Sequence, residues 1–172
     1  MATKTLFPLS RHWLDASVLI DAKNGPYPFG IAVGFWTWLA GKVEAGVIVS
    51  PKMCYDEIVR NEEAKDELAR WVKARRQRGL CIKPDREVQH LVGQIGEYVF
   101  SPRYETQESL DFSRGGDIWL IAHAMADNGT VVTQESHRRP DAKKVRIPDV
   151  CYRFGVSCIN LNELIRKLKA RF

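Results

Sequence analysis

The sequence of 172 residues lacks the features by which membrane-spanning, secreted and zinc-binding proteins are recognised. No apolar run approaches the roughly 18 residues needed to cross a bilayer. The first residues, MATKTLFPLSRHW, have no long apolar core followed by a small-residue cleavage site. The four cysteines form no C-x-x-C pair, and the four histidines are scattered along the chain. We therefore expect a cytoplasmic protein with reduced core thiols, no membrane partner and no structural zinc site.

The composition is typical of a globular domain. Hydrophobic residues make up 45% of the chain and charged residues 27%, which is enough apolar material for a core without disulfides or a metal. No linker or internal repeat divides the sequence, so we expect a single domain over residues 1–172. The net charge of +5 permits a polyanionic partner but does not establish one.

Short apolar runs alternate with longer segments of helical period, which is typical of an α/β fold with a mainly parallel central sheet. The runs predict strands at 13–15, 46–50, 129–135 and 155–160, with weaker candidates at 80–83 and 144–147. The other segments predict helices at 16–24, 32–46, 51–78, 84–99, 116–127, 148–154 and 161–170. Ser50 followed by Pro51 is the expected start of the long third helix. Residues 24–30 and 101–116 are expected to form loops, and the second is a candidate lid over a site.

Acidic residues fall where the strands of such a sheet end or the following helices begin. The four candidates are Asp15, Glu57, Asp117 and Glu135. In an open parallel sheet the ligand crevice lies outside the carboxyl ends of the strands, so these side chains would converge on one edge. Each residue alone has a simpler interpretation. Asp15 and Asp117 could cap or charge a helix N-terminus, Glu57 could belong to a solvated helix face, and Glu135 could lead into a surface turn.

Together, the four carboxylates favour a cation site. Like charges that lie close to one another raise one another's pKa values unless a cation lies among them. Oxygen ligands without histidine or thiol suit Mg²⁺ or Mn²⁺, which keep several waters and take further ligands from a substrate phosphate. The pattern therefore indicates metal-dependent hydrolysis of phosphodiester bonds.

The same residues resemble the PIN-domain ribonucleases, which include the VapC toxins of toxin–antitoxin pairs. The resemblance lies in LDASVLID at the end of the first strand, in Glu57, and in GGDIWLIAHAMADNGTVVTQE, with its Asp-x-x-[Ile/Leu]-Ala-x-Ala helix and Val-Thr-x-acid strand end. Within that family the chain is most similar to the DUF4411 branch, through YPFGIAVGFWTWL after the first helix and KVRIPDVCYRFGV near the end. The resemblance covers nearly the whole chain.

The resemblance implies a three-layer α/β/α sandwich with a central parallel sheet, and a Mg²⁺- or Mn²⁺-dependent endoribonuclease. It carries the four acids over as catalytic residues. Asp15, Asp117 and Glu135 would be metal ligands, whereas Glu57 would be a ligand or would orient the attacking water. One or two ions would bind the scissile phosphate, and the products would have 5′-phosphate and 3′-hydroxyl ends.

Further residues are assigned by the same resemblance. Ser17 and Thr133 match positions whose hydroxyls support the acids. Glu135 departs from the family pattern, in which the fourth position is more often Asp or Asn, and its longer side chain is suited to binding through water. Asp149 is a candidate fifth acid, with the alternative that it is a first-turn partner of a helix dipole.

The resemblance also implies an RNA substrate, a cognate antitoxin as partner of a type II toxin, and a candidate homodimer. Cations near the acids would hold RNA phosphates, with ordinary solvated loop charge as the alternative. The candidates are Arg138, Arg139, Lys143, Lys144, Arg146 and Arg114. Tyr27, Trp36 and Trp38 could stack on bases or pack a dimer, although core packing is the expected role of the tryptophans.

Other functional classes fit less well. A haloacid-dehalogenase-like enzyme would have a second Asp two residues after the first, where this chain has Ser17, and a receiver-like domain would show an acidic pair at its first strand. The remaining alternative is a catalytically weak PIN-like module that binds RNA or a protein, for which the unusual Glu135 is the argument. Asp21, within the first helix, is expected to face solvent.

Overall fold

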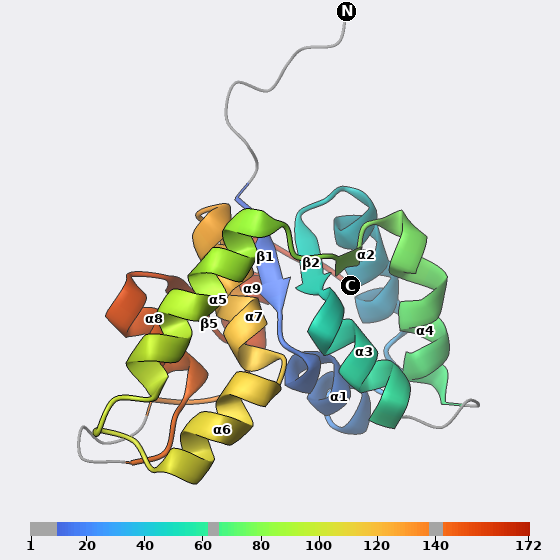
Figure 1. Ribbon diagram of the computed structural model, residues 1–172. Coiled ribbons are helices and arrows are strands. Elements are labelled where there is room, and N and C mark those ends of the chain that lie inside the picture. Colours follow the sequence, from blue (N-terminus) through green and yellow to red (C-terminus); the bar gives the residue numbers. More distant parts are fainter. Residues whose placement is uncertain (1–9, 62–65, 138–142) are drawn as a thin grey trace, which may run out of the picture.

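The computed structural model describes residues 10–61, 66–137 and 143–172. Its strands are β1 (His12–Leu14), β2 (Ile48–Pro51), β3 (Cys81–Ile82), β4 (Thr130–Val132) and β5 (Ser157–Ile159). They form one sheet in the order β3-β2-β1-β4-β5, and each of these pairings is parallel. Figure 1 shows β1 and β2 side by side near the middle of the molecule. Five of the six predicted strands, the weaker candidate at 80–83 among them, are thus confirmed in place.

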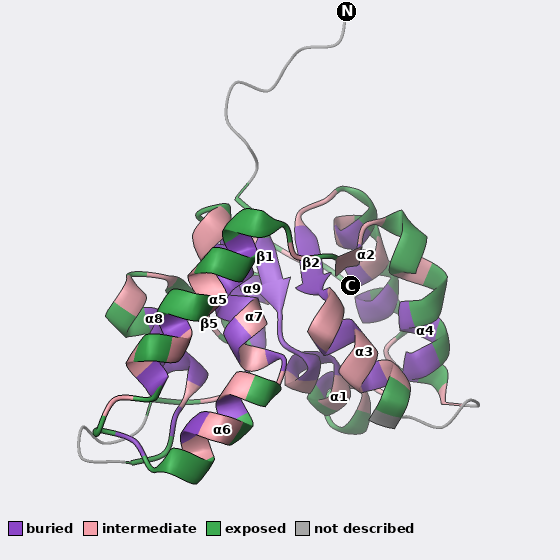
Figure 2. Ribbon diagram, in the orientation of Figure 1, coloured by how far each residue is buried: buried purple, intermediate pink, exposed green. Residues whose placement is uncertain are grey.

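Helices cover both faces of this sheet. Every residue of β1, β2 and β4 is buried, and neighbouring residues of a strand point to opposite faces, so neither face is open to solvent. Figure 2 accordingly shows buried strands at the centre and exposed residues on the outer sides of the helices. The three-layer α/β/α arrangement around a parallel sheet is the predicted fold class.

Each strand is followed by one or more helices. They are α1 (Ala16–Asn24), α2 (Val33–Glu44), α3 (Lys52–Asn61), α4 (Glu67–Arg75), α5 (Arg86–Val99), α6 (Thr106–Arg114), α7 (Asp117–Ala126), α8 (Ile147–Phe154) and α9 (Leu161–Lys167). The sequence of α7, DIWLIAHAMA, is apolar almost all round because the helix lies between strands β1, β2 and β4 and helix α5. In the part of the chain that the structure describes, no helix combines the length and the apolar character of a membrane span.

The single helix predicted over 51–78 is wrong, because the structure has two helices and a short 3-10 turn there. Pro51 is the last residue of β2, and α3 begins at the next residue. Asp66 starts a new helix, since its side chain accepts hydrogen bonds from the backbone N–H groups of Leu68 (2.7 Å) and Ala69 (3.2 Å). Helical period runs through the segment, so only the cap residue signals the break.

The loop predicted at 101–116 is wrong over most of that range, because Thr106–Arg114 form α6, and its role as a lid stays a prediction. Ser109 and Phe112 are buried, and Ser109 Oγ donates to the carbonyl oxygen of Val99 at the end of α5 (2.5 Å). Ser109 and Phe112 are one helical turn apart and lie on the same side of α6, which lets the helix pack against α5 and α7. The segment is therefore packed as a helix against the rest of the molecule.

The weaker strand candidate at 144–147 is also wrong. Arg146 has extended backbone geometry but precedes a helix, and Ile147 is the first residue of α8. Pro148 in the first turn of α8 explains the outcome, because proline is favoured at the start of a helix and cannot donate to a sheet.

Aromatic residues around α2 pack against one another. Phe29 stacks on Trp36 with ring centroids 3.9 Å apart, and Tyr27 stacks on Phe35 at 4.1 Å. Trp36 is 4% exposed, and its Nε1 donates to the carbonyl oxygen of Tyr27 (2.9 Å). The contacts place Trp36 in the core, as expected.

The chain changes direction across the sheet next to β1. It builds β2 and β3 on one side of β1, and then β4 and β5 on the other. The crevice at the carboxyl ends of β1 and β4 is therefore the topological switch point, where doubly wound α/β proteins bind ligands. Asp15 follows β1 directly, and Thr133 and Glu135 follow β4.

Candidate active site

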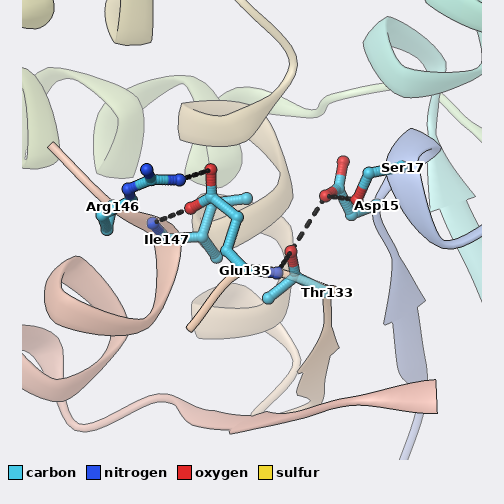
Figure 3. Close-up of polar contacts among 6 residues, drawn as sticks. All are labelled: Asp15, Ser17, Thr133, Glu135, Arg146 and Ile147. Atoms are coloured by element: carbon cyan, nitrogen blue, oxygen red, sulfur yellow. Dashed lines mark hydrogen bonds and ion pairs between the residues drawn. The ribbon is translucent and has the colours of Figure 1, made fainter. Parts of the chain in front are cut away.

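Asp15 lies at this switch point, between β1 and α1. It is 6% exposed, and its Oδ2 accepts hydrogen bonds from Ser17 Oγ (2.5 Å) and Thr133 Oγ1 (2.9 Å), as Figure 3 shows. Burial raises the pKa of Asp15, while the two hydroxyls oppose the rise by stabilising its charged form. Asp15 is the N-cap residue of α1 without a side-chain capping hydrogen bond of regular geometry, and the backbone N–H of Ser17 also favours its charged form.

Asp117 reaches the same crevice through a close approach of α7 to α3. Gly116 precedes it, and a Cβ atom at Gly116 would lie 2.9 Å from Sγ of Cys54 on α3. Because no other residue type lacks this atom, glycine lets α7 begin next to α3. The contact sets the position of the Asp117 carboxylate relative to Asp15.

The negative charges of the acids act on one another. Burial, followed by the charges of Asp15, Glu135 and Glu57, raises the pKa of Asp117 from 3.8 to about 8, and no hydrogen bond or cation among the described residues offsets these charges. Burial and then the charge of Asp15 raise the pKa of Glu57 as well, with Arg60 acting in the opposite direction. The four predicted acids are thus close enough to interact electrostatically.

Glu135 lies at this edge, but its carboxylate turns toward α8. Its Oε2 accepts from the backbone N–H of Ile147 (2.8 Å), and its Oε1 accepts from Arg146 Nη1 (3.2 Å). Figure 3 shows this contact and the link to the crevice, in which the backbone N–H of Glu135 donates to Thr133 Oγ1 (3.2 Å). A role of Glu135 as a direct metal ligand stays a prediction, and Arg146 competes for the same oxygen atoms.

A pocket of about 240 Å³ opens beside Asp117 and Glu135. Its wall also includes Glu108 and Asp111 of α6, together with Lys144. The sequence reasoning missed the two α6 acids because it treated their segment as a loop. Had a helix been predicted there, the i, i+3 spacing of the two acids would have placed them on one face.

The donor atoms around the crevice suit a hard divalent cation. Asp15, Glu57 and Asp117 offer carboxylate oxygens, and Mg²⁺ or Mn²⁺ takes such ligands while keeping several waters. Within the described ranges of the chain, no three His, Cys, Asp or Glu side chains are gathered so as to enclose an ion. The described residues therefore do not form an all-protein cage, and an ion held by these carboxylates would take its remaining ligands from water or substrate.

The predicted RNA-binding cations occupy different environments. Lys144 lines the pocket, Lys143 and Arg114 are exposed, and Arg146 is paired with Glu135. Two further candidates, Arg138 and Arg139, lie outside the described residues.

Asp149, the candidate fifth acid, lies in the first turn of α8. Its Oδ1 is 2.8 Å from Nδ1 of His137, which is exposed. This position agrees with the alternative that Asp149 is a partner of the helix dipole.

A family model described as "Domain of unknown function (DUF4411)" matches residues 12–172. The chain belongs to the DUF4411 family. The branch that the sequence resembles is thereby confirmed. No curated protein sequence matches this DUF4411 chain.

The DUF4411 chain shares its fold with solved structures at low sequence identity. FitAcB from Neisseria gonorrhoeae matches with a TM-score of 0.52 and 16% identity, over 87% of this chain and 96% of that chain. VapBC2 from Rickettsia felis, bound to a promoter DNA fragment, matches with a TM-score of 0.54 and 14% identity, over 87% of this chain and 97% of that chain. FitAB bound to the IR36 DNA fragment matches with a TM-score of 0.52 and 16% identity, over 87% of this chain and 94% of that chain. The likeness confirms the PIN-like α/β/α fold.

Proposed function

We propose that this protein is an endoribonuclease that depends on Mg²⁺ or Mn²⁺. The observation that carries the proposal is the mutual repulsion of Asp15, Glu57 and Asp117 at the switch point, which contributes to the Asp117 pKa of about 8. A divalent cation would relieve this repulsion and return the carboxylates to their charged forms. The crevice is also where a doubly wound sheet binds its ligand.

Each side chain would have its own task in cleavage. Ser17 and Thr133 both donate to Oδ2 of Asp15 and would hold its carboxylate in place for the ion. Asp117 would bind the ion from the start of α7, and Glu57 would bind it or orient the attacking water. Bound there, the ion would activate a water and stabilise the charge that develops on the leaving 3′ oxygen.

Glu135 would act differently from the other three acids. Its carboxylate is held by Arg146 and by the backbone of Ile147, so it would add negative charge to the site or reach the ion through water. Asp149 would contribute even less to metal binding, since its carboxylate contacts His137.

RNA would be held by cations around the pocket, which offset the repulsion between the acids and phosphate. Lys144 lines the pocket. Lys143 and Arg114 are exposed and could contact the phosphates of a bound RNA. Arg138 and Arg139 stay predictions of the same kind. Because phosphate contacts release counterions, RNA affinity should fall as ionic strength rises.

We further propose that the protein is the toxin of a type II toxin–antitoxin pair, with a cognate antitoxin as partner. The solved structures that share this fold include FitAcB, VapBC2 bound to a promoter DNA fragment, and FitAB bound to the IR36 DNA fragment. Expression should arrest bacterial growth, and co-expression of a neighbouring gene product should relieve the arrest. Harmless expression of an RNA-cleaving protein would instead indicate a housekeeping nuclease. A homodimer is also expected, and light scattering on the purified protein tests it.

A second candidate function is a catalytically weak module that binds RNA or a protein. The observation that favours it is the ion pair of Glu135 with Arg146, which leaves one of the four predicted acids less available to bind a metal ion. Such a module would bind RNA in chelator and in Mg²⁺ equally well and would cleave it in neither.

Cleavage assays separate the two functions. Purified wild-type protein should cleave single-stranded RNA in Mg²⁺ or Mn²⁺ and stop in EDTA. Asp15→Asn and Asp117→Asn should each lower the rate on the order of 100-fold or more, since each removes a charge that the ion needs. Asp21→Asn is the matched control, because Asp21 is an exposed aspartate on α1 and should leave the rate unchanged. Equal cleavage by wild type and Asp117→Asn would rule out this site as the nuclease centre.

A further inference from the structure

Two arginines and two tyrosines outside the acidic crevice are joined in one cluster. The guanidinium of Arg153, on α8, lies over the ring of Tyr98, on α5, with its Cζ atom 5.4 Å from the ring centroid. Tyr98 and Tyr104 meet edge to face with ring centroids 5.9 Å apart, and their hydroxyl oxygens are 3.2 Å apart. The guanidinium of Arg103 lies over the ring of Tyr104, also at 5.4 Å. We call these four residues the arginine–tyrosine cluster.

Both arginines of the cluster are exposed, and neither is ion-paired with a carboxylate in the part of the chain that the structure describes. Other arginines differ in this respect, since Arg146 is paired with Glu135 and Arg78 with Glu44. A guanidinium that stacks on a ring keeps its N–H donors for a further partner, and a phosphate matches them in geometry and charge. The cluster therefore offers two cations to a polyanion.

A backbone hydrogen bond joins the cluster to the wall of the pocket beside Asp117. The N–H of Glu105, which follows Tyr104 in the chain, donates to the carbonyl oxygen of Lys143 (3.1 Å). Lys143 is exposed, and the next residue, Lys144, lines the pocket together with Asp117. Figure 1 shows α5, α6 and α8, which flank these segments, on the same side of the molecule. Exposed cations thus lead from the pocket to α8 in the order Lys144, Lys143, Arg103 and Arg153.

Exposed aromatic rings accompany these cations. Phe100, in the loop after α5, is 49% exposed, and Tyr152, next to Arg153 on α8, is 85% exposed. The unpaired bases of a single strand stack on such rings and on guanidinium planes, whereas an acidic peptide has no bases to stack. Exposed acids, Glu97 and Glu105, also occur in this stretch, so the attraction depends on the row of cations and not on net charge. The combination favours a single-stranded nucleic acid.

We propose that the arginine–tyrosine cluster binds the part of a single-stranded RNA that extends out of the crevice on one side of the bond to be cut. The strand runs from the pocket over Lys144 and Lys143, and Arg103 and Arg153 contact its phosphates. The exposed rings beside them stack on its bases. This inference rests on the proposed nuclease function, because RNA is the substrate of that function, and it adds a contact outside the crevice that the substrate must be long enough to reach.

Fluorescence anisotropy in EDTA, which prevents cleavage, measures the affinity for a labelled single-stranded RNA of about 12 nucleotides. Arg103→Ala and Arg153→Ala should each weaken binding roughly 5-fold or more at low salt. Each should also flatten the slope of log Kd against log salt concentration by about 0.7, the value for one phosphate contact to a single strand. Arg76→Ala is the matched control, because Arg76 is an exposed arginine over the ring of Tyr55 (5.7 Å) that precedes β3, at the opposite edge of the sheet from β5. The control should bind RNA as wild type does.

Photocrosslinking locates the contact independently of any variant. RNA that carries 4-thiouridine should crosslink to wild-type protein in the tryptic peptides 87–103 and 147–153, which contain Phe100 and Tyr152. Crosslinks confined to other peptides would overturn the proposal.

The outcomes separate this inference from the proposed function. If wild type binds and cleaves RNA while both arginine variants bind like Arg76→Ala, the cluster is not part of the RNA site. If those variants instead lose only the relief of toxicity by a co-expressed antitoxin, the surface belongs to a protein partner and the inference is wrong. RNA binding that needs both arginines, without cleavage in Mg²⁺ or Mn²⁺, would support the cluster and contradict the nuclease alone. Absence of RNA binding by wild type would overturn both. Circular dichroism confirms that each variant is folded.

Discussion

Asp15 and Asp117 are two acidic residues in one crevice with different surroundings. Asp15 accepts two hydroxyl hydrogen bonds, from Ser17 and Thr133, which favour its charged form. Asp117 has no such support, and burial with neighbouring charges raises its pKa to about 8. In the absence of a cation the crevice therefore carries an electrostatic cost, and Asp117 bears its share without hydrogen bonds that stabilise its charge.

The stability of the metal-free protein should reflect this cost. The pKa of Asp117 is higher in the folded state, about 8, than the ordinary 3.8 expected after unfolding. Its contribution to stability is therefore complete below pH 3.8 and is lost as the pH rises to about 8. In EDTA, Asp117→Asn should be more stable than wild type at pH 8 by at least about 2–4 °C in Tm, with a smaller difference at pH 5. Thermal melts at both pH values check this. A lower Tm of the variant at pH 8 would contradict it.

Glu135 should matter for folding as well as for cleavage. Glu135→Ala leaves the N–H of Ile147 and the guanidinium of Arg146 without their acceptor, which costs about 1–3 kcal/mol of the free energy of unfolding. Urea denaturation measures this loss in the free energy of unfolding. Glu97→Ala, at an exposed position of α5, is the control. Equal midpoints for the two variants would show that the Glu135 contact contributes nothing.

The residues of the site were predictable to different degrees. The placement of Asp15 and Glu135 follows from strand ends, because parallel strands present their carboxyl ends at one edge. The orientation of Glu135 toward Arg146 could not be read from the sequence, because it depends on where α8 begins relative to β4. Glu108 and Asp111 were missed because their segment lacks long apolar side chains at regular spacing.

At the scale of elements, the contact between α3 and α7 positions the acids. Glu57 lies on α3 and Asp117 starts α7, and the two helices meet where Gly116 approaches Cys54. The distance between these carboxylates is therefore set by backbone packing.

Replacement of Gly116 tests this packing. Gly116→Ala places a Cβ 2.9 Å from Cys54 Sγ, so the variant should lose about 1–3 kcal/mol of stability and most of its Mg²⁺-dependent cleavage. Gly115→Ala is the matched control, because the nearest atom to its Cβ, the carbonyl oxygen of Asp111, is 3.4 Å away. Cys54→Ala should partly rescue Gly116→Ala. If both glycine variants melt and cleave alike, the close approach does not position the site.

The elements themselves were predictable where periodicity and end signals agree. The predicted helix at 16–24 matches α1, since an apolar helical stripe follows a strand directly. The segment 51–78 has helical period throughout, so its division depends on the capping bonds of Asp66, which a period does not reveal.

At the scale of the whole molecule, the alternation of buried strands and helices predicts the α/β class but not the order of the strands. The order β3-β2-β1-β4-β5 creates the switch point at which Asp15 and Thr133 meet. That order depends on which side of β1 each later strand joins, and this is decided by helix packing far along the chain. The PIN-like arrangement entered the prediction through resemblance to known sequences.

The central claim is that the crevice at the ends of β1 and β4 holds a divalent cation. Anomalous X-ray diffraction from a crystal soaked in Mn²⁺ tests it most directly, because the signal locates the ion without assumptions about activity. We predict a peak within ligand distance of Asp15 and Asp117, next to Glu57, and its loss in Asp117→Asn. The cation site would be contradicted by a crystal at saturating Mn²⁺ that shows no peak at this crevice and in which the three carboxylates lie apart.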